Sequence, residues 1–287
     1  MGKKRREPVP AEPLFPLIDG HTHLDSCGGT DPQGVHELMD RAEAVGVVAA
    51  VTVGCHINSV DNALMAAESD SRVWAALAQH PMDAHEIDEA GRVRLAELVQ
   101  HPRVVAVGEC GLDYYWIERE PETTATQVQQ EELFRWHIDL AKKVGKPVMI
   151  HARDVDADLI RILDDEGAPE KTIIHCFSSG VEMAHRCAER GFYATFGGST
   201  TFKPNAELRE AVQVFPHDRI MVETDAPYLT PEPFRGAKNE PQYVAYTAYR
   251  LAEVIGMSPT DFAELTTRNA CRCLLYTSDA ADDSLRV

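Results

Sequence analysis

The sequence contains no apolar run that approaches the roughly 18 residues needed to cross a membrane. Its best run, residues 45–53, has the length and β-branched composition of a strand. Basic residues are also scarce: 28 lysines and arginines stand against 46 aspartates and glutamates, a formal net charge of −18. This balance argues against a broad basic face that coats nucleic acid or anionic membranes. It does not exclude a site whose positive charge comes from bound metal ions.

Cysteine patterning and targeting signals are also lacking. The seven cysteines are an odd number without C-x-x-C spacing, which is typical of reduced thiols in a reducing compartment. Residues 1–16 lack the apolar segment of a signal peptide, and their basic, then proline-rich composition predicts a disordered leader. We therefore expect a cytoplasmic protein with no membrane contact and no obligate protein partner.

The region from residue 17 to residue 272 alternates β-rich runs with amphipathic helical stretches. The strand candidates are residues 17–21, 47–54, 73–79, 104–109, 148–151, 172–175, 192–196 and 220–223. The clearest helical candidates between them are residues 34–45, 127–144, 157–166 and 206–214. Eight such units in about 250 residues predict an α/β fold, a (β/α)8 TIM barrel. An open doubly wound sheet would normally have fewer strands and a glycine-rich phosphate loop, and neither G-x-G-x-x-G nor G-x-x-x-x-G-K-[ST] is present.

Domain boundaries follow from composition. No compositional shift occurs within residues 17–272, which predicts a single domain. Residues 273–287 form an atypical tail whose sequence looks like a translated sequencing adapter. We interpret this tail as an artefact in place of the native end, and we assign it no function.

Metal-binding residue types stand at the ends of five predicted strands. Barrels of this kind build their active sites at the C-terminal ends of the strands. The candidates there are His21, His23, Glu109, His151, His175 and Asp225. Each has an ordinary structural explanation when taken alone, such as a helix cap for Asp225, but five coincidences at five strand ends are improbable. His56 and His80 follow the second and third strands and are weaker candidates for substrate contact.

These candidates are suited to one metal centre. His21 and His23 are two residues apart, so an extended strand would direct both imidazoles to the same face. Imidazole and carboxylate together suit Zn²⁺, Mn²⁺, Fe²⁺, Co²⁺ or Ni²⁺ better than Ca²⁺. Six ligands are too many for one four-coordinate ion, whereas a pair of ions about 3.5–4 Å apart needs about this number. Glu109 is the natural bridge between two ions because a carboxylate has two oxygens.

Several segments together resemble the TatD family of metal-dependent hydrolases, within the amidohydrolase-like barrels. The resemblance covers nearly the whole chain and lies in residues 21–25 (HTHLD), 108–114 (GECGLDY), 148–153 (VMIHAR), 175–178 (HCFS), 223–229 (ETDAPYL), 235–239 (RGAKN) and 268–270 (RNA). It implies two divalent ions per subunit, with Zn²⁺, Mn²⁺, Mg²⁺, Ni²⁺ and Co²⁺ as candidates. It also implies the ligand sets, which are His21, His23, Glu109 and Asp225 for one ion and Glu109, His151 and His175 for the other.

The resemblance further implies a deoxyribonuclease that trims DNA from its 3′ end with metal-activated water. In this interpretation Glu109 and Asp225 are the catalytic residues, and Asp225 orients the water and takes up its proton. Arg153, Arg235 and Asn239 are predicted to bind substrate phosphates, because a guanidinium can hold a phosphate through two hydrogen bonds. A salt bridge to a neighbouring aspartate is an equally plausible role for Arg153. The aromatic residues 114–116 either stack a base or pack in the core.

Two other functions compete with this one. For the deoxyribonuclease, the expected substrate is short or single-stranded DNA or another phosphoester. The same centre could instead hydrolyse a carbonyl substrate such as a D-aminoacyl-tRNA ester, a lactone or an amide. A non-catalytic barrel scaffold is disfavoured because all six candidate ligands are present.

Overall fold

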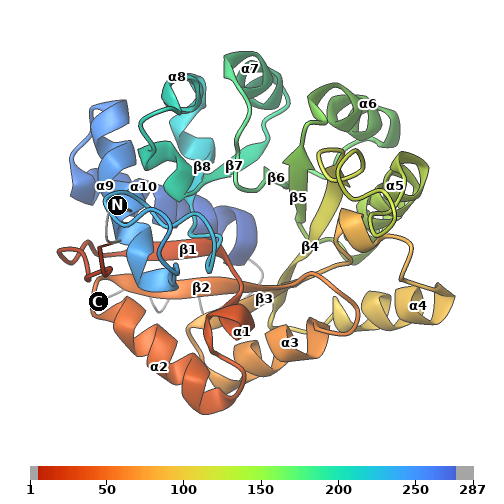
Figure 1. Ribbon diagram of the computed structural model, residues 1–287, viewed down its shortest axis with the longest axis horizontal. Helices are drawn as coiled ribbons and strands as arrows, with labels where there is room; N and C mark the ends of the chain where they lie inside the picture. The colour runs from red at the N-terminus through yellow and green to blue at the C-terminus, as the bar shows by residue number, and fades with distance from the viewer. Residues whose placement is uncertain (1–5, 276–287) are drawn as a thin grey trace.

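The computed structural model describes residues 6–275. These residues form a barrel in which eight parallel strands lie side by side in sequence order, from β1 to β8. An isolated parallel bridge between Thr22 and Ala226 joins the first strand to the segment after the last one. Helices surround the strands on the outside (Figure 1). This is the predicted (β/α)8 TIM barrel.

The elements alternate along the chain as the sequence predicts. The strands are β1 (Leu17–Thr22), β2 (Val47–Gly54), β3 (Val73–Leu77), β4 (Val104–Asp113), β5 (Val148–Arg153), β6 (Thr172–Ile174), β7 (Tyr193–Phe196) and β8 (Ile220–Val222). The α-helices are α1 (Leu24–Cys27), α2 (Pro32–Glu43), α3 (Val60–Ser69), α4 (Glu89–Leu98), α5 (Gln127–Val144), α6 (Asp156–Glu166), α7 (Val181–Glu189), α8 (Ala206–Val214), α9 (Val244–Ile255) and α10 (Pro259–Ala270). No described helix is both long and apolar enough to span a bilayer.

Local sequence signals set the helix ends. Helix α5 begins with a capping box, in which the side chains of Thr126 and Gln129 satisfy each other's main-chain N–H groups. It ends at Gly145, whose φ of 67° is the left-handed conformation that glycine adopts without strain. Helix α2 begins at Asp31, whose carboxylate accepts a hydrogen bond from the N–H of Gly34. The predicted and observed bounds of α5 agree because such signals are local.

Two layers of apolar side chains hold the barrel. The larger layer packs the strands against the helices and includes Leu17, Val107 and Ile150. The smaller one fills the inside of the barrel, where Ile18 and Met149 pack with residues of the other strands. The inner layer leaves the C-terminal ends of the strands to polar side chains.

Strand β1 departs from regular alternation, and this departure places His21. Ile18 belongs to the inner layer, and a regular strand would send His21, three residues later, to the opposite face. The pairing of β1 with β2 instead shows a register shift between Asp19 and Thr22. His21 therefore also points inward, where its Nδ1 lies 3.2 Å from the sulfur of Met149.

The two ends of the described chain correct the predicted domain limits. The leader was predicted to be disordered, but Leu14 is buried in the outer layer and donates its N–H to the carbonyl of Val45. At the other end Cys273 and Leu274 are buried in the inner layer, so the packed domain extends beyond residue 272. Both corrections have one cause: apolar side chains in the extensions cover barrel surface. Residues 1–5 of the predicted leader and 276–287 of the predicted tail lie outside the described residues.

Candidate metal centre

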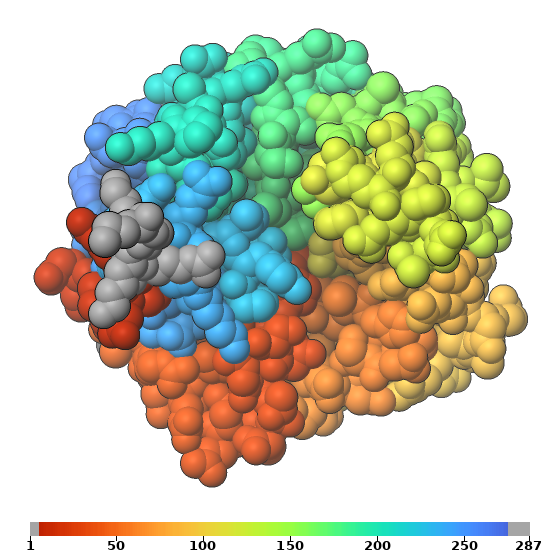
Figure 2. All heavy atoms as spheres, viewed as in Figure 1, coloured from red at the N-terminus to blue at the C-terminus, as the bar shows by residue number. Residues whose placement is uncertain are grey.

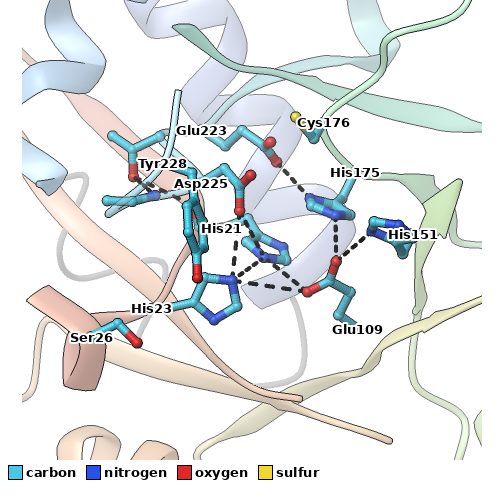
Figure 3. A network of polar contacts seen from close by, with 12 residues as sticks. His21, His23, Ser26, Glu109, His151, His175, Cys176, Glu223, Asp225 and Tyr228 are labelled. Carbon is cyan, nitrogen blue, oxygen red and sulfur yellow. Dashed lines mark hydrogen bonds and ion pairs between the residues drawn. The ribbon is translucent and has the colours of Figure 1, made fainter. Parts of the chain in front are cut away.

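The six predicted ligands come together inside the mouth of the barrel (Figure 3). They come from β1, β4 and β5 or from the segments just after β1, β6 and β8, and they are largely shielded from solvent. Ligand atoms lie within 4.8 Å of one another in three groups, His21–Glu109–His175, His21–His23–Asp225 and His80–Glu109–His151. The first prediction about the site, that these strand-end residues converge, therefore agrees with the geometry.

Glu109 lies at the centre, and its two carboxylate oxygens face different partners. Oε1 is 2.8 Å from Nδ1 of His151 and 2.8 Å from Nε2 of His175. Oε2 is 3.5 Å from Nε2 of His21 and 3.9 Å from Nε2 of His23. Figure 3 shows this division, with the carboxylate standing between the two groups of imidazoles. One carboxylate thus serves two neighbouring sets of donor atoms.

The first of these sets contains two imidazoles and a second carboxylate. The Nε2 atoms of His21 and His23 are 3.3 Å apart. Oδ1 of Asp225 lies 3.7 Å and 3.6 Å from them, respectively. The Asp225 side chain is 16% exposed, more than that of Glu109 at 6%, so it is the carboxylate of the centre that opens most to the mouth. This set offers two imidazole nitrogens and a carboxylate oxygen to one small space.

Outer partners fix the orientation of the imidazoles. Nε2 of His151 lies 2.9 Å from Oδ2 of Asp113, so its Nδ1 is the nitrogen left for the centre. Nδ1 of His175 lies 3.5 Å from Oε2 of Glu223, which is fully buried, and its Nε2 faces Glu109. A carboxylate behind a histidine is the common arrangement around metal-bound imidazoles, because it fixes the tautomer and the ring direction.

Electrostatics keep the carboxylates of the centre ionised. Burial alone would raise the pKa of Glu109, but the charge of His175 and hydrogen bonds from His151 and His175 hold it well below its usual range. Burial likewise opposes ionisation of Asp225, and a hydrogen bond from His23 outweighs it and lowers the pKa. The pKa of His175 is raised well above normal because Glu109 and Glu223 outweigh its burial. In the protein alone, protons on histidines thus balance the buried carboxylates, and metal ions would displace those protons.

The donor set fits a pair of divalent cations. Nitrogen and carboxylate donors converge from several strands, and such sites suit Zn²⁺, Mn²⁺, Co²⁺ or Ni²⁺. Two buried polar atoms of the surrounding shell, Nδ1 of His175 and Oε1 of Glu223, have no hydrogen-bond partner among the described residues. Nδ1 of His175 faces Glu223 and not the centre, so the fit to cations rests on the nitrogen and carboxylate donors that converge there.

His80 belongs to the same cluster, although the sequence made it only a weak candidate for substrate contact. Its Nε2 lies 3.6 Å from Oε1 of Glu109, and its Nδ1 accepts a hydrogen bond from the N–H of Met82. Burial and the charge of His151 lower its pKa to about 3, so the ring is neutral. Because Nδ1 accepts a hydrogen bond, the proton sits on Nε2 and points toward the centre. His80 is therefore placed as a hydrogen-bond donor, and only its position just past β3 could have indicated this.

His56, the other weak candidate, has a different partner. Its Nε2 lies 2.8 Å from Oε2 of Glu86, and it is not part of any ligand group among residues 6–275.

Asn239 has a different place from the one the sequence suggested. Its side chain is only 1% exposed, and Nδ2 donates to the carbonyls of Thr224 and Tyr228. Its Oδ1 accepts the N–H of Glu240. The N–H groups and the oxygen of the amide are thus all hydrogen-bonded to main-chain groups of the segment after β8. This corrects the prediction that Asn239 binds substrate. The loop it holds carries Asp225, so its contribution is to the position of that carboxylate.

The two predicted substrate arginines are exposed. The guanidinium of Arg153 lies 3.7 Å from the centroid of the Tyr115 ring, and it forms no salt bridge with its neighbours Asp154 and Asp156. The guanidinium of Arg235 lies 4.2 Å from the Phe202 ring. Stacked arginines of this kind keep their N–H groups available for an anion.

Comparisons with known proteins show the family and the fold. A family model described as TatD related DNase matches residues 18–275. The chain is 48% identical over 256 residues to an uncharacterized metal-dependent hydrolase TatD of Mycobacterium tuberculosis, covering 89% of this chain and 97% of that one. It is 32% identical over 253 residues to a 3′-5′ ssDNA/RNA exonuclease TatD of Cronobacter turicensis, covering 85% and 93% of the two chains. The crystal structure of YJJV, a TatD homologue of Escherichia coli, superposes with a TM-score of 0.81 at 25% identity over 90% of this chain and 98% of that one.

Proposed function

The chain belongs to the TatD family of metal-dependent hydrolases, and on that premise we propose that it is a binuclear metal-dependent phosphodiesterase that trims single-stranded DNA from the 3′ end. The printed activity of the Cronobacter relative, a 3′-5′ exonuclease on single-stranded DNA and RNA, supports this choice. The polar residues at the barrel mouth support the proposal by offering a site for it.

One observation carries the proposal. The two oxygens of Glu109 face two adjoining pairs of imidazoles, His151 and His175 at 2.8 Å from Oε1, and His21 and His23 at 3.5 Å and 3.9 Å from Oε2. A single ion would need only one of these groups, whereas two ions need a carboxylate between them. Bound there, the ions would lower the pKa of a water molecule and polarise the phosphoryl oxygen.

The side chains of the mouth supply the remaining steps. Asp225 is the most exposed carboxylate of the centre and its pKa is lowered, which supports a role in which it would take a proton from the attacking water and pass it to the leaving oxygen. The Nε2–H of His80 is placed to donate a hydrogen bond to an oxygen of the substrate phosphate. Arg153 and Arg235 would hold further phosphate oxygens, since neither is paired with a carboxylate among the described residues.

A direct experiment distinguishes this activity from hydrolysis of a carbonyl substrate. Manganese-loaded protein is incubated with a 5′-labelled single-stranded oligonucleotide, with the same oligonucleotide blocked by an inverted 3′ nucleotide, and with a neutral aryl ester. We expect a ladder of shortened products from the first and none from the blocked strand. Hydrolysis of the ester with no cleavage of either oligonucleotide would contradict the proposal.

Metal stoichiometry tests the binuclear centre itself. After loading with Mn²⁺ or Zn²⁺ and removal of free metal, elemental analysis should find about two ions per chain, because two donor groups share Glu109. His56→Ala is the matched control, since it removes a histidine that is paired with Glu86 away from the centre, and it should keep both ions. A ceiling of one ion in the loaded wild-type protein would rule out the bridging arrangement.

Arg153 should distinguish charged from neutral substrates. Arg153→Ala is expected to lower kcat/KM for a short single-stranded oligonucleotide. The loss of transition-state stabilisation should be about 1.5–3 kcal/mol, the scale of a hydrogen bond to a charged group. A neutral aryl ester, if it is a substrate, brings no phosphate and should lose much less. Both values are measured on the two proteins side by side. Equal losses on the two substrates would mean that Arg153 supports only the fold or the metal centre.

A further inference from the structure

Few arginines in the described part of the chain remain without a carboxylate partner. Most of the described arginines form an ion pair with a carboxylate within 4.0 Å, as expected for a protein with many more acidic than basic residues. Arg103 and Arg209 donate to several main-chain carbonyls instead. Apart from Arg6 near the start of the chain, the described arginines that remain are those that stack on aromatic rings. They are Arg119, Arg153 and Arg235.

Two of these arginines share one ring. The Cζ atom of Arg119 lies 3.5 Å from the centroid of Tyr115, and that of Arg153 lies 3.7 Å from it. Two guanidinium planes cannot occupy the same face at these distances without overlapping, so they lie on opposite faces and their carbons are about 7 Å apart. Both faces of Tyr115 are therefore covered, which removes this ring from the residues predicted to stack a base. It serves instead as a spacer that holds two cations.

The stack stands at the rim of the metal centre. Arg153 ends β5, two residues after His151, which places their Cα atoms roughly 7 Å apart at about 3.3 Å per residue. The N–H of Tyr114 donates to the carbonyl of Arg153, so the segment after β4 is fastened to the end of β5. Figure 2 shows that segment, in yellow, beside the hollow in the middle of this face. Arg153 thus follows a residue of the centre along β5, and Arg119 lies across the Tyr115 ring from Arg153.

The surroundings favour an anion that arrives from outside over a partner from the chain itself. Arg119 lies between Glu118 and Glu120 in the sequence, yet the structure gives it an ion pair with neither, and its Nη1 donates to the carbonyl of Tyr115. Arg153 lines an open cleft of about 470 Å³ together with Asp154, Asp156, Ser178 and Ser179, a size that admits a nucleotide, and it is paired with neither aspartate. Both arginines are exposed, and their positive charge is rare on a chain with a net charge of −18.

We infer that Arg153 and Arg119, held on the two faces of Tyr115, bind two consecutive phosphates of a single-stranded nucleic acid whose terminal phosphodiester occupies the metal centre. This inference rests on the proposed function and extends it to the length of the substrate. An interval of about 7 Å is close to the through-space separation of consecutive phosphates in a nucleic-acid strand, which exceeds the rise of about 3.4 Å per nucleotide because the phosphates also wind around the axis. The choice of a single strand comes from the proposed function. The preferred substrate is therefore an oligonucleotide of about four nucleotides or more.

The test is the dependence of the Arg119→Ala effect on substrate length. We measure kcat/KM for oligothymidylates of two to eight nucleotides with the manganese-loaded protein. In the wild type, kcat/KM should rise up to about four nucleotides and then level off. Arg119→Ala should lower it about tenfold on the hexamer, mainly through KM, and less than twofold on the dinucleotide. The slope of log(kcat/KM) against log(salt) on the hexamer should become shallower by about 0.7, the value for one phosphate contact on a single strand.

The matched control is Arg186→Ala, which removes an exposed arginine that is paired with Glu182 on α7. It should leave the length dependence and the salt slope of the wild type unchanged. The inference would be overturned if Arg119→Ala lowered kcat/KM by the same factor on the dinucleotide and the hexamer, or if it left the salt slope on the hexamer unchanged.

A second measurement does not need activity. Fluorescence anisotropy with 5′-fluorescein hexathymidylate and metal-free protein should show several-fold weaker binding for Arg119→Ala than for the wild type. If wild-type protein cleaves no phosphodiester, the proposed function fails, and this binding difference still decides whether the site exists. Equal binding by the two proteins would overturn the site. Fluorescein-labelled hexaglutamate is the competing ligand. If it binds as tightly as the oligonucleotide, with the same dependence on Arg119, the assignment of this site to nucleic acid would be overturned.

Discussion

Glu109→Gln is expected to lower kcat/KM between a few hundredfold and several thousandfold at saturating metal. Glu109 is 4% exposed, and its two oxygens face four imidazoles from two donor groups. Removing the charge of one member of a buried ionic cluster costs roughly 3–5 kcal/mol, and each 1.36 kcal/mol is tenfold in rate. The amide would weaken both metal positions at once. His21→Ala should cost less, because Nε2 of His21 lies beside only one of the two Glu109 oxygens, Oε2 at 3.5 Å, and the bridging carboxylate itself remains.

The matched control for Glu109→Gln is Glu86→Gln. Glu86 also accepts a hydrogen bond from a histidine, His56, but on an exposed part of the surface. This variant should keep wild-type kcat/KM and both metal ions. Elemental analysis and thermal unfolding of the loaded proteins separate loss of metal from loss of fold. Near-wild-type activity of a folded Glu109→Gln protein at saturating metal would show that Glu109 does not bridge two ions.

Asp225→Asn is expected to lower kcat about 10²–10⁴-fold, the usual contribution of a positioned acid or base. The carboxylate lies at the mouth, 3.6 Å from Nε2 of His23, and an amide in its place cannot accept a proton. KM for the oligonucleotide should change little at saturating metal, because the arginines that hold the phosphates remain. The measurement is kcat and KM for wild type and variant over a range of metal concentrations.

The control for this substitution is Asp61→Asn, which removes a surface carboxylate paired with Arg94. It should leave both kinetic constants unchanged. A normal kcat for Asp225→Asn once metal is raised would assign Asp225 to metal binding alone and leave the proton acceptor to another group.

Much of the fold could be predicted because its signals are local. Eight β-rich runs separated by helical stretches require parallel strands with covered faces, and eight such units close into a barrel. The convergence of the candidate ligands then follows, because the C-terminal ends of parallel strands share one rim. Residue type and position along the chain were enough to bring together Glu109, His151 and Asp225 without any knowledge of their contacts.

Contacts between distant segments could not be predicted in this way. The inward turn of His21 depends on a register shift against β2, which no spacing within β1 reveals. The amide of Asn239 was assigned to substrate from its loop position, but main-chain carbonyls elsewhere in that loop use its N–H groups. His80 looked incidental because its partner, Glu109, is 29 positions away and is brought to it only by the pairing of β3 with β4.

By itself, then, the sequence determined the barrel, the kind of chemistry and the set of residues at its mouth. These depend on periodicity and residue type, which are properties of each short segment. Only the tertiary structure decided which oxygen of Glu109 faces which imidazole and that Arg119 and Arg153 share the ring of Tyr115. Such details are fixed when separate strands and loops pack together, because the direction of a side chain depends on partners that its own segment does not contain.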